Sequence, residues 1–391
     1  MSATGIVESR SPHRVAGDLS RRASGALAAL ALALASVRPS NAARGQSLSM
    51  SLGLASVYDD NLLQYSSNQR DLFLSGTKPD RFSIHTLDDL TWSPQVGLTW
   101  TLDRGAGRRR SLRAHFSGDL HSKNSTADLR SASLSLHESF QRGHRISLGY
   151  YTVPKYYLRQ LIAEDYVPPF PGLSRYHRAE FGLDIGSITW EQALGKRLDL
   201  GLAYQLENRG YNSDFRERDS KTHQARLSLL LSGPDRGNSL GLLAGYRWDL
   251  AKGEDGDEPE APPDADISYH GPIAGVEGRM QLTRSRTWRL SGEATYWLGY
   301  RGYDSNRPGD PYHFGRSDVI QTVESGLRLA LRPHWTLRGF YRFESSDARL
   351  GSTAPPTSDV GSYRQQQVGV GVEWSYAIWR QSRHEESDAS D

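Results

Sequence analysis

The sequence predicts an all-β fold: a transmembrane antiparallel up-and-down β-barrel of about 14 strands, with a range of 12 to 16. Apolar and polar residues alternate with a period of two along most of the chain. The alternating segments are about ten residues long or longer, whereas strands of soluble proteins usually have about five or six. The connections between them are alternately short and long.

The alternation begins in residues 47–58, where the even positions are apolar and the odd positions are small. This pattern places one face of a strand in an apolar medium and the other in a polar one. The odd positions carry Ser47, Ser49, Ser51 and Gly53. The pattern recurs in 95–102, 111–121, 131–140, 145–152, 179–190, 198–208, 222–232, 240–250, 272–282, 288–300, 319–331, 335–343 and 366–376.

One of these segments, 179–190, is irregular. Its outward set begins as Phe181, Leu183 and Ile185 and then shifts to Ile188 and Trp190. An extra residue in one strand would produce such a shift, so we expect a β-bulge there.

The connections support a membrane barrel independently of the strands. Short turns on the periplasmic side and long loops on the extracellular side are typical of these barrels. A soluble β-sandwich, the main alternative fold, has no reason to alternate its loop lengths. The short connections are 103–110, 141–144, 194–197, 233–238, 283–287 and 332–334. The long ones are 59–80, 122–128, 158–176, 211–220, 251–266, 304–316 and 345–361. Six turns and seven loops put both barrel ends on the periplasmic side.

Composition excludes several classes of function. The 391 residues include no cysteine, which rules out a disulfide framework, a thiolate metal site and a cysteine nucleophile. The net charge of +2 gives no basic field for nucleic acid. We expect no cofactor, no metal site and no nucleic-acid partner.

The N-terminal region predicts export. Twelve mostly apolar residues, 26–37, follow Arg21 and Arg22, and Ser40 to Ala42 fit a cleavage site. This apolar stretch is too short to span a bilayer. We therefore expect a cleaved signal peptide at 1–42, a barrel at 43–378 and a polar tail at 379–391.

The last alternating segment carries a recognisable motif. Gln367, Gly369, Val372 and Trp374 follow the order of polar, glycine, hydrophobic and aromatic residues found in the C-terminal assembly signal of outer-membrane barrels. On these residues, the region from Ser47 to Tyr376 resembles the bacterial outer-membrane β-barrel superfamily. The tail beyond residue 378 departs from members that end on an aromatic residue.

A second motif, residues 57–61 (VYDDN), resembles the loosely defined β-barrel porin group, some of whose members lie in exopolysaccharide gene clusters. The two resemblances imply integral location in the outer membrane, with lipid and lipopolysaccharide around the barrel. They also imply that the barrel assembly machinery inserts the chain. Whether the barrel has further partners in the periplasm or in polysaccharide export stays open.

The polar phase of the strands predicts the lining of the lumen, the space inside the barrel. Arginines and acids are mixed there, which fits either a polar channel with a transverse field or a salt-bridged plug. The lining candidates are Arg113, His115, Asp119, Glu180, Asp184, Glu207, Arg209, Arg226, Arg247, Asp249, Glu277, Arg279, Arg289, Glu293, Arg301, Glu324, Arg328, Arg338, Arg342 and Glu373.

The loop at 158–171 mixes apolar and charged residues with three prolines, which is unusual for a solvated loop. We expect it to fold inward and constrict the lumen, with Arg159, Tyr166 and Phe170 as candidate constriction residues. Deleting 157–171 should then raise single-channel conductance. The acidic loop at 254–266 could bind divalent cations, but its spacing fits no EF-hand, and a solvated loop is the simpler interpretation.

These features lead to an expected function. A porin-like channel or transport barrel for hydrophilic solutes fits best, and a barrel component of polysaccharide export or another envelope complex is the alternative. A membrane-embedded hydrolase is a third possibility, because His115, Ser117, Asp119 and His121 share one strand face. Neighbours on one strand face are about 7 Å apart, too far for direct hydrogen bonds between most side chains. We therefore expect no enzymatic activity.

Overall fold

The computed structural model describes residues 45–105, 108–140, 143–162, 176–234, 237–253, 266–306, 312–331, 333–350 and 361–382. Within them, fourteen antiparallel strands form one closed barrel, which confirms the predicted fold class and strand number. The strands are β1 (Gly45–Asp59), β2 (Asp89–Gly105), β3 (Arg108–His121), β4 (Leu129–Ser139), β5 (His144–Ile162), β6 (Tyr176–Ala193), β7 (Leu198–Tyr211), β8 (Ser220–Ser232), β9 (Ser239–Ala251), β10 (Tyr269–Arg284), β11 (Trp288–Tyr303), β12 (Ser317–Leu331), β13 (Trp335–Arg349) and β14 (Tyr363–Ser382). The predicted signal peptide lies outside the described residues.

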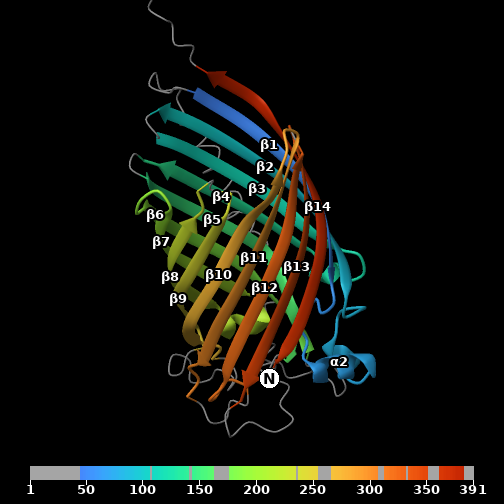
Figure 1. Ribbon diagram of the computed structural model, residues 1–391. Helices are drawn as coiled ribbons and strands as arrows, with labels where there is room; N and C mark the ends of the chain where they lie inside the picture. The colour runs from blue at the N-terminus through green and yellow to red at the C-terminus, as the bar shows by residue number, and fades with distance from the viewer. Residues whose placement is uncertain are drawn as a thin grey trace, which may run out of the picture. The chain divides into compact units, whose positions relative to one another are not determined.

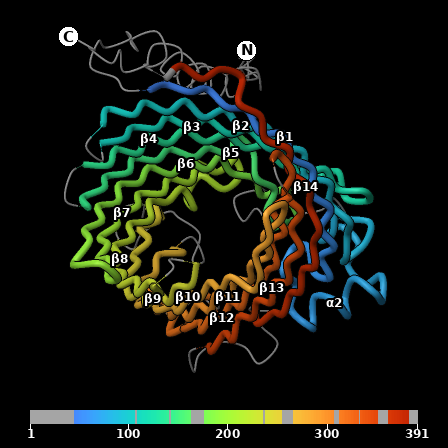
Figure 2. The backbone as a smooth tube through the Cα atoms, turned by 45° about the horizontal axis from the view of Figure 1, so that its top comes forward, coloured from blue at the N-terminus to red at the C-terminus, as the bar shows by residue number. Residues whose placement is uncertain are grey.

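The barrel closes where its first and last strands pair. β1 runs antiparallel to β14 from Gly45 opposite Ser382 to Asp59 opposite Gln367, so no sheet edge is left open (Figure 1). Figure 2 shows the closed ring of strands. β14 continues to Ser382, so the first four residues of the predicted tail belong to this strand.

Strand bounds place the short connections at one end of the barrel and the long ones at the other. β1 begins and β14 ends at the end with the short connections, because Gly45 pairs with both Asp103 and Ser382. Within the described residues no helix is both long enough and apolar enough to cross a membrane.

The outer face of the barrel is apolar and exposed. Leu242 is 56% exposed and Val370 63% exposed, values far from those of a protein core. Cross-strand partners share a face, and Leu242 lies opposite Leu229 on β8 and Val276 on β10, both also exposed. The period-two alternation of the sequence is therefore the alternation between the outside and the inside of the barrel.

The prediction for residues 179–190 was wrong in two respects. Phe181, Leu183 and Ile185 lie opposite Tyr211, Arg209 and Glu207 of β7, so they face inward. Glu180 and Asp184 alternate with them and face outward, where Asp184 accepts a hydrogen bond from the Tyr150 hydroxyl (2.5 Å). The register of β6 with β7 is continuous, and the irregularities fall in the partner strand β5, at 153–156 and 157–159.

Apolar character alone favours an outward, lipid-facing position for these residues of β6. The inner residues instead meet other side chains inside the barrel: Tyr156 stacks on Phe181 at 4.9 Å between ring centroids, and Phe181 lies 5.1 Å from Tyr211. An aromatic cluster inside the lumen therefore replaces the expected polar lining at this position.

The first long connection is ordered and contains a helix that the sequence did not reveal. α2 (Ser67–Leu74) begins with a capping box between Ser66 and Gln69. A small hydrophobic cluster of Leu63, Tyr65, Ile84 and Tyr157 fixes the connection against β5. Both views show α2 outside the ring of strands (Figures 1 and 2).

Candidate functional site

The register around the barrel places the predicted lining residues. Many predicted lining residues lie opposite another lining residue or opposite a small inner residue of the next strand. Examples are Arg226 opposite Gly245, Glu277 opposite Thr295, and Glu324 opposite Arg342. Apart from Glu180 and Asp184, the predicted lining residues share the inner face. Among them are Arg113, Asp119, Glu207, Arg209, Arg226, Arg247, Glu277, Arg279, Arg289, Glu293, Glu324, Arg328, Arg338 and Arg342. Their part in solute passage stays a prediction.

The inner faces of β7–β14, here called the arginine wall, are rich in ion pairs. Most of the pairs link adjacent strands or neighbouring inner positions of one strand, as cross-strand geometry allows, and the pair of Arg209 with Asp249 reaches from β7 past β8 to β9. Arg209 pairs with Glu207 (2.5 Å) and Asp249 (3.2 Å), Arg279 with Glu293 (3.5 Å), Arg338 with Glu373 (3.1 Å), and Arg342 with Glu324 (3.4 Å) and Glu344 (2.6 Å). These pairs brace the wall.

The inner faces of β1–β4, here called the serine wall, carry many hydroxyl side chains, with Arg113, His115 and Asp119 among them. Ser117 and Ser131 are hydrogen-bonded across β3 and β4 (2.7 Å), and Ser93 donates to Asp119 (2.6 Å). Because serine is small, this wall leaves more of the lumen free than the arginine wall does. Its hydroxyl residues include Ser47, Ser49, Ser51, Ser93, Thr99, Ser111, Ser117, Ser131, Ser133 and Ser135.

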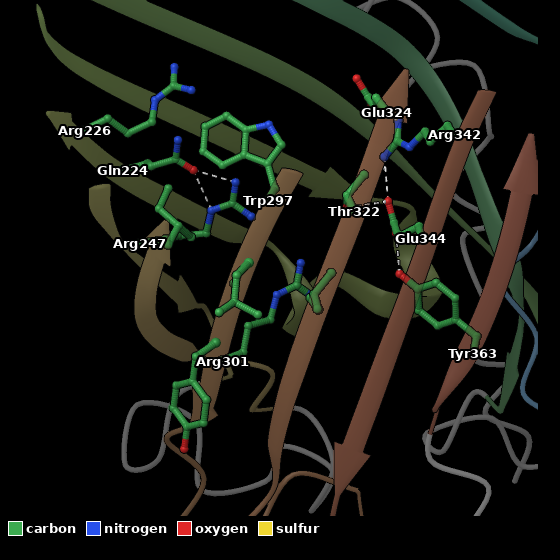
Figure 3. Close-up of a pocket in the computed structure, with 15 residues that line it drawn as sticks. Gln224, Arg226, Arg247, Trp297, Arg301, Thr322, Glu324, Arg342, Glu344 and Tyr363 are labelled. Atoms are coloured by element: carbon green, nitrogen blue, oxygen red, sulfur yellow. Dashed lines mark hydrogen bonds and ion pairs between the residues drawn. The ribbon is translucent and has the colours of Figure 1, made fainter. Parts of the chain in front are cut away.

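A cavity of about 370 Å³ opens on the arginine wall (Figure 3). Residues from β8 to β14 line it, and strands so far apart around the ring can share a cavity only on the inside. Arg247 donates two hydrogen bonds to Gln224, at 2.8 and 2.5 Å. Trp297 projects between this pair and Thr322 in the view of Figure 3.

Glu344 organises the other side of this cavity. It is 8% exposed and accepts hydrogen bonds from the Tyr363 hydroxyl (2.6 Å), Arg342 (2.6 Å) and Gln64 (3.0 Å). Gln64 belongs to the first long connection, so this carboxylate joins the barrel wall to that loop. The carboxylate is well satisfied and has a structural role in the wall.

The 57–61 motif and the final-strand motif meet in the fold. The Asp59 carboxylate accepts hydrogen bonds from Gln367 (2.8 Å) and Gln365 (2.7 Å). The side chain of Asn61, which is fully buried, bonds the backbone carbonyls of Tyr65 and Arg364 (both 2.9 Å). The two motifs therefore fix the first loop to the start of β14.

Of the three predicted constriction residues, Arg159 alone lies among the described residues. Arg159 lies in β5, where its guanidinium donates to the backbone carbonyl of Leu63 (3.0 Å) and stacks on Tyr65 (5.4 Å to the ring centroid). Burial raises the pKa of the Tyr65 phenol, which therefore stays neutral beside this arginine. Tyr166 and Phe170 lie outside the described residues.

Beyond Thr152, β5 has no pairing with β4 among the described residues, yet it stays paired with β6 as far as Ile162. This projecting end of the hairpin packs on two sides. Tyr157 contacts the first loop, and Ala179 packs with Phe215 of the connection after β7. The projecting hairpin is thus a supported element at the end with the long loops.

Three of the four residues that suggest a hydrolase have separate partners. Ser117 bonds Ser131, Asp119 bonds Ser93, and His121 lies 3.3 Å from Asp128. In the part of the chain that the structure describes, no hydrogen bond links either histidine to Ser117, and no group of three or more His, Asp or Glu is placed to hold a metal. Residues 254–265 of the acidic loop lie outside the described residues.

The predictions named the arginines and acids but omitted Trp297, Gln224, Glu344 and Tyr363 as site residues. A signal for one of them exists in the sequence. Trp297 stands between Tyr296 and Leu298 at an inner position of β11, where an aromatic residue breaks the polar phase. Nothing in the sequence alone indicates that Glu344 and Tyr363 would meet.

No protein-family model and no curated protein matches this chain. Among solved structures, it is similar to a bacterial polysaccharide outer membrane secretin, with a TM-score of 0.42 and 12% identity over 84% of this chain and 98% of that chain. It is also similar to an anion-selective porin from Comamonas acidovorans (TM-score 0.39, 10% identity, 85% and 99%) and to OprD of Pseudomonas aeruginosa (TM-score 0.38, 9% identity, 85% and 96%). The barrel fold itself rests on the strand pairing described above.

Proposed function

We propose that this chain is an integral outer-membrane channel for hydrophilic solutes. One observation carries the proposal: a closed barrel has an exposed apolar outer face and an inner face of hydroxyl and charged groups. A closed barrel satisfies its backbone hydrogen bonds within the sheet and can therefore cross lipid. A polar lining allows water and solutes inside.

The orientation follows the usual rule for such barrels, with short turns in the periplasm and long loops outside the cell. The projecting β5–β6 hairpin and the first loop then lie at the extracellular mouth. We infer that they narrow this mouth, because Arg159 ties the hairpin to the loop and Gln64 ties the loop to Glu344 on the opposite side of β1. A selective channel fits this arrangement better than a wide pore.

The partners follow from the same proposal. Lipid and lipopolysaccharide surround the apolar outer face, and the barrel assembly machinery inserts the chain through the motif in β14. Partners in polysaccharide export are the second candidate for a role in the envelope, and genes for glycosyltransferases beside its own gene would favour them.

Conductance across a planar lipid bilayer tests the proposal. The refolded barrel should produce discrete current steps in potassium chloride, and the same protein unfolded by heat should produce none. A folded barrel that inserts into the bilayer, as shown by resistance to protease, and yet carries no current would overturn the channel function.

A further inference from the structure

Three arginines of the cavity have no acidic partner among the described residues, whereas Arg342 beside them has two. Arg247 bonds the neutral amide of Gln224, and Arg301 stacks over the Tyr269 ring at 4.8 Å. Arg226 makes no hydrogen bond or ion pair within the described residues. Its acidic neighbour Glu277 lines an adjoining cavity but forms no ion pair with it among those residues.

The positive charge of the cavity is therefore only partly compensated. Four arginines line it against two glutamates, and Arg342 pairs with both Glu324 and Glu344. The remaining guanidiniums, Arg226, Arg247 and Arg301, face a lumen partly enclosed by protein, where a cation attracts an anion more strongly than in bulk water.

The space beside these arginines suits a small organic molecule. Gly299 lines the cavity at an inner position, and a Cβ there would meet only Ile273, at 3.7 Å. The Trp297 ring lies against Gly275, where an added Cβ would stand 2.7 Å from the ring. The indole is thus held flat along the wall, and the volume of about 370 Å³ lies in the range of small-molecule sites.

Guanidinium geometry indicates the class of anion. A carboxylate can accept two parallel N–H donors from one arginine, which gives a directional contact that a spherical ion cannot match. Stacking on Tyr269 uses the face of the Arg301 guanidinium and leaves its N–H edges available. A flat apolar surface of the same solute can lie on the Trp297 ring.

We propose that Arg226, Arg247, Arg301 and Trp297 form a binding site for small organic carboxylates inside the lumen. This proposal rests on the proposed channel function, because it names the class of solute that the channel would bind. The arginines bind the carboxylate, and the indole binds the ring of an aromatic acid or the C–H face of a sugar acid.

Calorimetric titration of the refolded full barrel in detergent tests the site, with benzoate and glucuronate as separate probes and benzamide and glucose as their uncharged analogues. At least one carboxylate should bind, and its uncharged analogue should not. The double variant R226Q/R247Q and the single variant R301Q should each weaken binding by about tenfold or more. G299L should abolish binding by filling the cavity without changing its charge.

R338Q is the matched control, because it removes one positive charge from the lumen outside this cavity, next to Glu373. Binding that falls equally in R338Q, or that sodium chloride displaces at the same concentration as the carboxylate, would show a general electrostatic effect and overturn the site. Benzoate and glucuronate distinguish an aromatic acid from a sugar acid.

Bilayer current measured on the same preparation separates the two proposals. Current without carboxylate binding overturns the site and leaves the channel standing. Binding that the cavity variants remove, in a barrel that carries no current, supports the site and overturns the channel.

Discussion

The serine wall and the arginine wall are built from strands of the same length and alternation, yet their inner faces differ in size and charge. Ser131 and Ser133 of β4 stand where Arg226 of β8 or Arg342 of β13 stand on the other side. The outer faces are alike, because both meet the same apolar surroundings. The inner face is free to vary, and under the proposed channel function it is the face that would set a preference among solutes.

The two walls are also held together differently. On the serine wall, hydroxyl pairs such as Ser117 with Ser131 are neutral and short. On the arginine wall, buried carboxylates such as Glu344 hold several donors at once. A neutral hydrogen bond contributes about 1 kcal/mol, whereas breaking a buried charged network costs more.

The largest expected effect is on the stability of the arginine wall. Glu344→Gln should lower the free energy of unfolding by roughly 2–4 kcal/mol, because Arg342 loses a buried partner. Ser133→Ala on the serine wall should change it by no more than about 0.5 kcal/mol. Urea unfolding of the refolded protein in lipid vesicles measures both, and equal losses would contradict the difference between the walls.

A second pair of variants, both on β9, tests whether the inner side of the arginine wall faces water. Leu242 and Leu243 are adjacent on β9, and the register places Leu242 outside and Leu243 inside. Leu242→Arg should cost about 2–4 kcal/mol in lipid vesicles, since a charge near the bilayer centre is unfavourable. Leu243→Arg should cost clearly less, and a reversed order would invert the assignment of faces.

Pore size should depend on the serine wall. Ser133→Trp places a large ring in the lumen and should lower single-channel conductance by an amount on the order of tens of per cent. Leu134→Trp, one residue along and facing outward, serves as the control and should leave the conductance unchanged. Similar conductance in both variants would mean that solutes do not pass beside the serine wall.

The smallest effect concerns the loop that follows β1 of the serine wall. Because burial raises the folded-state pKa of Tyr65, its contribution to stability is complete below the ordinary pKa of about 10 and is lost as the pH rises above it. Protease cleavage in residues 60–88 should therefore increase above about pH 10, and Tyr65→Phe should reduce this increase. The same increase in the variant would exclude Tyr65 as its cause.

The sequence predicted the barrel well because lipid imposes one simple rule. Every second residue of a strand such as β9 must be apolar, and that rule is visible in the chain itself. It failed at Phe181, Leu183 and Ile185, because apolar residues can also face inward when they meet aromatic partners such as Tyr211. Hydrophobicity reports the medium around a residue, and in β6 that medium is another part of the protein.

The candidate site, like the barrel, was predictable from the sequence only in part. Alternation alone identified Arg226, Arg247 and Arg342 as lining residues, since polar side chains opposite an apolar phase must point inward. Which arginines lack an acid partner among the described residues depends on the strand register and on how the inner side chains pack, and the sequence holds no local sign of either.

By itself, the sequence determined a barrel of fourteen strands, the two faces of most of them and the end at which the long loops lie. Only the tertiary structure decided that Gln64 reaches Glu344, that Arg159 ties β5 to the first loop, and that three arginines share one cavity with Trp297. The physical reason is that alternation is a local consequence of the surrounding medium. Side-chain partners depend instead on closure and register, which bring together residues hundreds of positions apart.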